Sequence, residues 1–143
     1  MTIASITQLP GEPIFVCVYE GEITAADIFD TYQTTGRLWK DELKTSGSHV
    51  ITDLRQITNI TFVETMKSLQ VTHEQEKVFA SMMPYVHFYA VGSNVMAKLY
   101  VSSRRLPQFG GVTIPLFARY EDALDAARMA IIKKGETLPT DEA

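Results

Sequence analysis

Polar side chains that could bind a small anion stand at the ends of two segments predicted to be buried strands. Asp53 and Arg55 close one segment, and Ser93 and Asn94 follow the next one along the chain. The carboxyl ends of neighbouring parallel strands meet at one edge of a sheet, where the N–H groups of a following helix can bind anions. These residues could line a rim for a ligand or a partner. We favour the structural explanation, in which Asp53 pairs with Arg55 or with the backbone and residues 93–94 cap a helix.

Two adjacent arginines, Arg104 and Arg105, form a second candidate for recognition. They stand near the end of a predicted helix, where they could bind an acidic partner. Cations at that position also complement the negative end of the helix dipole, and exposed ion pairs add little stability. We favour this structural role for both residues.

The chain carries no pattern typical of an enzyme or a metal site. Its histidines, His49, His73 and His87, form no close ligand pair, and its single cysteine, Cys17, lies in an apolar run. Serine-hydrolase elbows, phosphate loops and dinucleotide fingerprints do not occur. We therefore predict a protein that is not an enzyme, with no catalytic residue, metal or cofactor. We expect His87 to be at least half-buried in its strand and His73 to face solvent.

Composition indicates one ordinary globular domain. The chain has 143 residues, of which 45% are hydrophobic and 21% charged, and such a chain can bury a core without disulfides. We assign residues 1–135 to the domain and residues 136–143 to a loose polar tail. The net charge of −4 argues against nucleic acid as a partner. The absence of a signal-like start and of a membrane span predicts a cytoplasmic location.

A β-hairpin is predicted to begin the framework that positions these residues. β-rich runs at residues 3–7 and 14–20 flank the turn-forming residues 10–13. A helix follows, which Thr24 and Asp27 cap.

Two strand–helix units come next. In the first, a strand at residues 49–54 precedes a helix that Thr61 and Glu64 open as a capping box and that ends near residue 80. In the second, a strand at residues 85–91 precedes another helix. We expect that helix to turn an apolar stripe inward, made of Val95, Leu99 and Leu106.

A third unit completes the pattern. A short strand at residues 112–117 leads to a final helix that ends at Gly135, and its apolar stripe is Tyr120, Leu124, Ala127 and Ile131. The order ββαβαβαβα predicts an α/β fold with a mixed, mostly parallel sheet, an antiparallel N-terminal hairpin at its edge, and helices packed on the sheet.

An apolar segment at residues 78–84 contains two adjacent methionines. We expect it to pack in the core. If it were exposed, it would suit self-association or a flexible apolar ligand, and Tyr100 and Phe109 could extend it.

Short motifs in a fixed order resemble the STAS-like, or SpoIIAA-like, domain family over nearly the whole chain. The motifs are Gly21-Glu22-Ile23-Thr24, Asp53-Leu54-Arg55, and Phe117 followed by Glu121-Asp122-Ala123-Leu124. The resemblance implies the STAS-like fold. For the members that antagonise anti-sigma factors, it also implies a phosphorylated serine motif at the start of the helix after the third strand.

That serine pair has no counterpart with a hydroxyl in this chain. Counting from Asp53, the pair falls on Phe62 and Val63. The hydroxyls of Thr58 or Thr61 could replace it. We favour a helix N-cap for Thr61, a role worth about 1 kcal/mol.

These observations leave two functional hypotheses. We prefer a non-enzymatic regulatory or protein-interaction module whose partner is another protein or a second copy of the chain. The alternative is a protein that binds a small apolar or anionic molecule near Arg55, Ser93, Asn94 and the third helix. A flat apolar face would favour the first hypothesis, and an enclosed cavity with convergent polar groups would favour the second.

Overall fold

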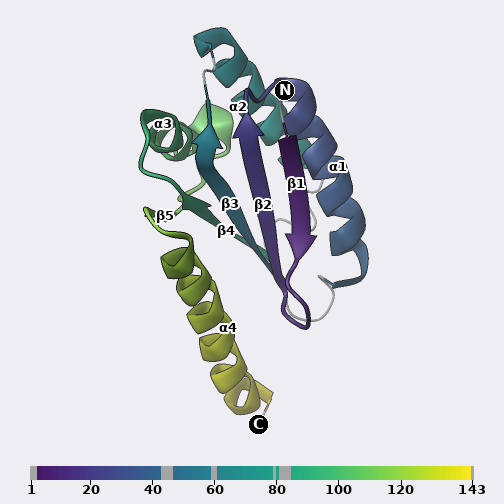
Figure 1. Ribbon diagram of the computed structural model, residues 1–143. Helices are drawn as coiled ribbons and strands as arrows, with labels where there is room; N and C mark the ends of the chain where they lie inside the picture. Colours follow the sequence, from purple (N-terminus) through teal and green to yellow (C-terminus); the bar gives the residue numbers. More distant parts are fainter. Residues whose placement is uncertain (1–2, 43–46, 59–60, 79, 81–84, 143) are drawn as a thin grey trace.

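A five-stranded sheet organises the part of the chain that the structure describes (Figure 1). The structure is a computed structural model that describes residues 3–42, 47–58, 61–78, 80 and 85–142. The strands lie in the sheet in their chain order. The elements are β1 (Ile3–Gln8), β2 (Ile14–Gly21), α1 (Ala25–Glu42), β3 (Ser48–Ile57), α2 (Phe62–Val78), β4 (Val86–Val91), α3 (Val95–Arg104), the short 3-10 helix η2 (Pro107–Phe109), β5 (Leu116–Phe117) and α4 (Tyr120–Glu142).

The pairing of the strands confirms the predicted mixed sheet. Strand β1 pairs antiparallel with β2, and the pairs β2–β3, β3–β4 and β4–β5 are parallel. The register places Cys17 beside Thr52, and Thr52 beside Ala90, across three neighbouring strands. These side chains share one face of the sheet, and that face becomes the floor of the site described below.

Helices cover both faces of the sheet (Figure 1). Helices α1, α2 and α3 pack on the face that carries Cys17 and Ala90. On the opposite face, Ile51 and Val91 pack against α4 through Ala123. The central strands therefore bury side chains on both faces, which explains why their sequences are apolar without a clean alternation.

Capping side chains start the first two helices. The backbone N–H of Thr24 donates to the Asp27 carboxylate at 2.8 Å, and the Asp27 N–H donates to the Thr24 hydroxyl at 3.3 Å, which confirms the predicted capping box. At α2, the Glu64 N–H donates to the Thr61 hydroxyl at 3.1 Å, which is one half of the predicted capping box. The Glu64 carboxylate accepts from the N–H of Ala25 at 2.9 Å, so this residue links the starts of α1 and α2.

The predicted inward stripe of α3 was wrong. Val95 is 78% exposed, Leu99 36% and Leu106 44%, so all three face solvent. The residues of α3 that are buried are Ala97, Val101, Ser103 and Arg104. Gly92 explains this rotation of the helix, because a Cβ at Gly92 would lie only 2.8 Å from the Cβ of Ala97. The small side chain of Ala97 thus faces the sheet where the backbone approaches most closely.

The C-terminal tail also differs from the prediction. Helix α4 continues through Gly135 to Glu142, whereas the sequence predicted a stop at Gly135 and a loose tail over residues 136–143. One glycine costs a helix only about 1 kcal/mol relative to alanine, so it need not end the helix.

In the methionine segment, residues 79 and 81–84 lie outside the described residues. His87 was expected to be at least half-buried, but it is exposed on its strand and stacks on the buried His49 ring at 4.7 Å.

Candidate functional site

The charged groups of the predicted rim, in the carboxyl-terminal half of β3, bond to each other. The Arg55 guanidinium donates to both carboxylate oxygens of Asp53, at 3.0 and 2.7 Å, and the Arg55 N–H donates to the same carboxylate. The Asp53 side chain is 5% exposed and that of Arg55 44%. The hydrogen bond with Asp53 raises the pKa of Arg55. This is the pairing that the structural explanation predicted.

Asn94, which follows the neighbouring strand β4, has a similar structural role. Its side-chain oxygen accepts from the N–H of Ala97 at 2.8 Å, and its amide donates to the carbonyl of Leu54 at 3.1 Å. Asn94 therefore caps α3 and joins it to the end of β3, while Ser93 beside it is exposed. The rim residues lie close together, yet most of their hydrogen-bonding capacity is already used.

The hydroxyls considered for phosphorylation lie at the start of α2. Thr58 is exposed, and its backbone N–H donates to Gly21. Thr61 is also exposed and its hydroxyl caps the helix. Phe62 is the first residue of α2, and Val63 is 60% exposed in the same first turn.

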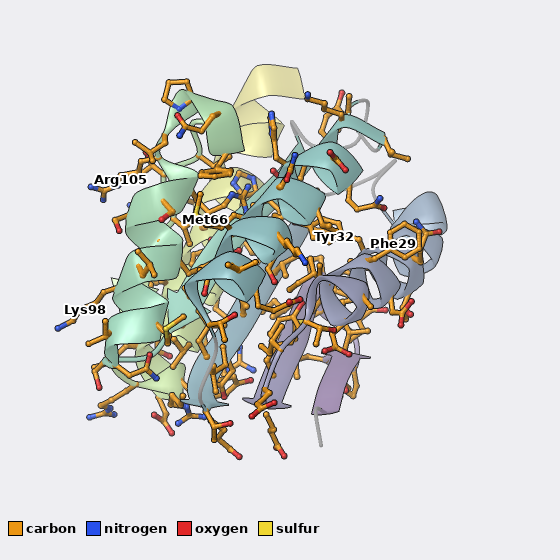
Figure 2. The ribbon with its side chains drawn as sticks, turned by 90° about the horizontal axis from the view of Figure 1, so that it is seen from above. Phe29, Tyr32, Met66, Lys98 and Arg105 are labelled. Carbon is orange, nitrogen blue, oxygen red and sulfur yellow. The ribbon has the colours of Figure 1, made fainter. Side chains whose placement is uncertain are left out.

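Arg104 was wrongly placed on the surface by the sequence analysis. Its side chain is fully buried and forms a 2.5 Å ion pair with Glu76 of α2. It also donates to the carbonyl of Phe109 at 3.1 Å and to the hydroxyl of Tyr100 at 3.3 Å. Arg105 alone of the two arginines points outward (Figure 2).

This buried ion pair joins the three helices on one face of the sheet. The hydroxyl of Tyr32 on α1 donates to the second oxygen of Glu76 at 3.0 Å. Breaking a buried pair is costly because one charge stays behind without a partner. The sequence contained a signal for it, since Ala97, Val101 and Arg104 recur at helical spacing and place the arginine on the inward side of α3.

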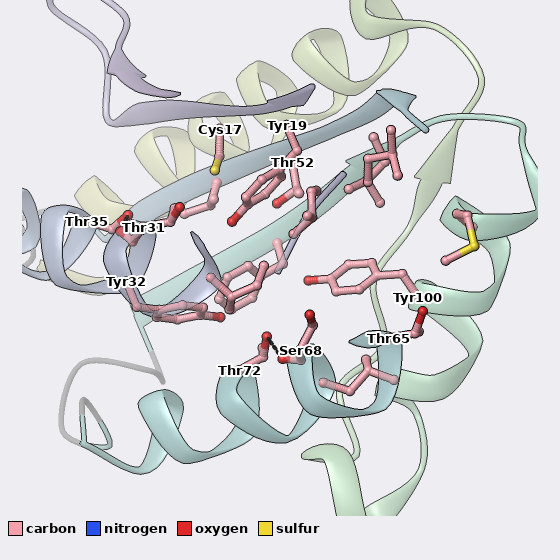
Figure 3. Close-up of a pocket in the computed structure, with 18 residues that line it drawn as sticks. Cys17, Tyr19, Thr31, Tyr32, Thr35, Thr52, Thr65, Ser68, Thr72 and Tyr100 are labelled. Carbon is pink, nitrogen blue, oxygen red and sulfur yellow. Dashed lines mark hydrogen bonds between the residues drawn. The ribbon is translucent and has the colours of Figure 1, made fainter. Parts of the chain in front are cut away.

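Next to this ion pair lies a cavity that the sequence analysis missed (Figure 3). Its volume is about 90 Å³, and it lies between the sheet face of β2, β3 and β4 and the helices α1, α2 and α3. None of the described residues that line it is acidic, basic or a histidine. The lining is mainly aliphatic and aromatic, with several hydroxyl groups among the apolar side chains. It is thus an uncharged site.

Threonine hydroxyls in the cavity wall are directed to their own helices. Thr35 donates to the carbonyl of Thr31 at 2.7 Å, Thr65 to that of Thr61 at 2.9 Å, and Thr72 to that of Ser68 at 2.8 Å. Their protons are therefore not available to a molecule in the cavity. This bonding lets helices with polar sequences face an apolar space at little cost.

Burial keeps the thiol and phenol groups of the cavity neutral. It raises the pKa of the Cys17 thiol to about 11 and places that of Tyr19 well above its usual value. It raises the pKa of Tyr100 too. A charge is disfavoured in such a site because no water or counter-charge replaces its hydration. The Cys17 thiol is consequently protonated at neutral pH and a poor nucleophile.

Ser68 of α2 differs from the threonines beside it. Its hydroxyl oxygen is buried and has no hydrogen-bond partner in the structure. Figure 3 shows this hydroxyl turned toward the cavity, opposite the ring of Tyr100. The sequence carried a signal for this wall, because Thr65, Ser68 and Thr72 recur at helical spacing and form a stripe of hydroxyls on one side of α2.

Comparison with solved structures places this arrangement in a known fold. One neighbour is an uncharacterised DUF3478-family protein from Shewanella loihica PV-4, described as having a SpoIIAA-like fold. It has a TM-score of 0.57 and 12% identity, over 88% of this chain and 93% of that one. The chain has the SpoIIAA-like, or STAS-like, fold. Another neighbour is an anti-sigma factor antagonist from Mycobacterium paratuberculosis, with a TM-score of 0.53 and 16% identity over 90% of this chain and 95% of that one.

Comparison by sequence finds no match to this chain. No protein-family model matches the chain, and no curated protein matches it. Among the described residues, no cluster of three His, Cys, Asp or Glu side chains could hold a metal ion. Within the same residues, no helix combines the length and the hydropathy that crossing a membrane requires.

Proposed function

We propose that this chain is a non-catalytic regulatory module that binds a small, uncharged and mainly apolar molecule in the cavity beneath α1, α2 and α3. The cavity is the observation that carries the proposal. It supports the ligand-binding hypothesis because it is a mainly apolar hollow in which the Ser68 hydroxyl has no hydrogen-bond partner. It lies on the other side of β3 from the rim where the sequence analysis had placed a ligand, in front of the buried side chains of Cys17 and Thr52.

The volume limits the size of the ligand. A cavity of about 90 Å³ is smaller than the ~150 Å³ engineered cavity that accepts benzene. A molecule of four to six heavy atoms would occupy it with small shifts of the walls, by roughly the same comparison.

The fold supports the regulatory part of the proposal. One structural neighbour is described as an anti-sigma factor antagonist, a protein that acts on other proteins. A ligand under α1 and α2 would alter how these helices pack and so change the surface offered to a partner. As part of the same proposal we keep a cytoplasmic location and a role without catalysis, which the protonated Cys17 thiol also favours.

A titration followed by NMR tests whether the cavity binds. Cyclopentane is added to the labelled protein, and we expect saturable shifts of backbone amides around the cavity, such as those of Tyr19, Leu54 and Thr72. The double variant Cys17→Leu/Thr52→Ile enlarges two paired side chains on the cavity floor and should abolish these shifts. Val18→Ile is the matched control, because it adds one methylene to the same strand on the opposite face. Identical titrations of the double variant and the wild type would overturn the proposal.

A second candidate function, protein interaction without a small ligand, is favoured by the outer face of α3. Val95, Leu99 and Leu106 are exposed there, and Lys98 and Arg105 point outward beside them (Figure 2). An apolar stripe flanked by cations suits a partner with acidic side chains around an apolar centre.

A photo-crosslinking residue at position 99 tests this second function in cells. It should yield one adduct whose contact segment is acidic, and the same residue at position 132 of α4 serves as the control. An adduct with a second copy of the chain would assign the face to self-association. The absence of any adduct specific to position 99 would exclude the face as a docking site.

A further inference from the structure

Ser68 stands out among the polar groups of the cavity because its hydroxyl oxygen is buried and has no hydrogen-bond partner. The Thr65 and Thr72 hydroxyls, on the same side of α2, donate to carbonyls one turn earlier. The Tyr32 hydroxyl donates to Glu76. The Ser68 hydroxyl makes no such bond, although it is buried. A buried hydroxyl without a partner loses its hydration with no compensation, so native proteins rarely keep one without a reason.

The charges around the cavity exclude an anion as the missing partner. The guanidinium of Arg104, which bonds to the cavity residue Tyr100, is also bonded to Glu76 and Phe109. No lysine, arginine or histidine belongs to the described lining. A carboxylate placed there would be desolvated with only hydroxyl groups around it, which is strongly unfavourable. A neutral acceptor, by contrast, needs only the one donor that Ser68 supplies.

We propose that Ser68 is the polar anchor of the cavity and that its O–H donates to the oxygen of a small, uncharged carbonyl compound with an apolar body. This inference rests on the proposed function, because it names the chemical class of that ligand. The carbonyl oxygen lies against α2, and the apolar body occupies the space in front of Cys17 and Thr52. The Ser68 hydroxyl, which has no partner within the protein, then has one in the ligand.

Two probes that share one ring test the anchor. Cyclopentanone carries an acceptor oxygen, whereas cyclopentane does not. The affinity of each is measured by the NMR titration described above, for the wild type and for Ser68→Ala. We expect Ser68→Ala to weaken cyclopentanone binding about fivefold, the effect of losing one neutral hydrogen bond, and to leave cyclopentane binding unchanged. Each probe is compared between the wild type and Ser68→Ala, so the difference in hydrophobicity between the two probes does not affect the result.

Thr72→Val is the matched control on the same helix. It removes a hydroxyl of similar burial whose proton is already used within α2, so neither probe should lose affinity. Cyclopropanecarboxylate, an anionic probe with as many heavy atoms as cyclopentanone, should not bind the wild type, and binding as tight as that of cyclopentanone would overturn the neutral class. Equal losses of both neutral probes in Ser68→Ala would overturn the anchor and leave the cavity as a binding site. If neither neutral probe binds the wild type, the proposed function itself fails.

Discussion

The rim near the end of β3 and the cavity beneath α1, α2 and α3 both contain polar residues, but the hydrogen bonds of these residues differ. At the rim, Asp53 and Arg55 bond to each other, and the Asn94 amide bonds to the backbone of Leu54 and Ala97. In the cavity, the helix threonines donate to carbonyls of their own helices, and the buried Ser68 hydroxyl has no partner. The rim thus uses most of its hydrogen-bonding groups internally, whereas the cavity has an unused donor.

This difference shows that a visible cluster of charged residues is a weaker indication of a binding site than an unsatisfied group beside empty space. Asp53 and Arg55 drew attention because they are charged and close in sequence. That closeness is also what lets them neutralise each other. Ser68 carries no charge and has an unremarkable sequence context, yet its surroundings leave it without a partner.

The largest effect we expect comes from the buried ion pair beside the cavity. Arg104→Ala leaves Glu76 buried without its cation and should reduce the free energy of unfolding by about 3–5 kcal/mol. Denaturant unfolding followed by circular dichroism measures it. The double variant Glu76→Leu/Arg104→Met removes both charges and should be clearly more stable than Arg104→Ala. If the two variants were equally destabilised, the loss would come from packing and not from an unpaired charge.

The second effect concerns the reactivity of the Cys17 thiol. With a pKa of about 11 in place of the usual 9.0, the folded protein holds about a hundredfold less thiolate at pH 8 than an ordinary thiol does. Alkylation by iodoacetamide should therefore be slower than for the unfolded chain in denaturant, by less than the thiolate ratio alone because a more basic thiolate is more nucleophilic. Because steric protection also slows the reaction, the pH profile decides. The rate should keep rising about tenfold per pH unit beyond pH 9, and a plateau near that pH would contradict an apolar cavity.

Substitutions at the rim should reduce the free energy of unfolding less than substitutions in the Glu76–Arg104 ion pair, because water reaches the rim. Arg55→Gln leaves the nearly buried Asp53 carboxylate with fewer donors and should lower the free energy of unfolding by about 2 kcal/mol. Asp53→Asn leaves a half-exposed arginine in water and should cost about 1 kcal/mol. Denaturant unfolding of both variants measures this asymmetry. Neither variant should change the affinity for cyclopentanone, and a loss there would mean that rim and cavity act as one site.

The order of the elements could be predicted from the sequence because it depends on local signals. The Thr24–Asp27 box, the Asn94 cap and the apolar strands each act within a few residues, and together they indicated the SpoIIAA-like order of strands and helices. The orientation of α3 could not be predicted in the same way. It depends on the contact of Gly92 with Ala97 and on a partner for Arg104 that comes from another helix.

The cavity depends on such long-range relations even more. Thr31 and Thr35 of α1 face Thr65 and Thr72 of α2 only after both helices have packed on the sheet. Read one helix at a time, these residues resemble the polar side of a surface helix. The stripe of hydroxyls on α2 can be seen in the sequence. That it lines a cavity can be seen only once α1 and the sheet are placed opposite it.

The smallest effect we expect has the opposite sign to the others, and it separates a ligand anchor from a structural residue. Ser68→Ala removes a buried donor without a partner and introduces a better helix former, so the ligand-free protein should gain about 0.5–1 kcal/mol in the free energy of unfolding. Thermal and denaturant unfolding measure it, with Ser102→Ala on α3 as the control, since that hydroxyl already donates to the carbonyl of Lys98 at 2.8 Å. A residue retained for stability would lose stability on this change. A gain, together with the weaker binding of cyclopentanone, is what a residue retained for its ligand should give.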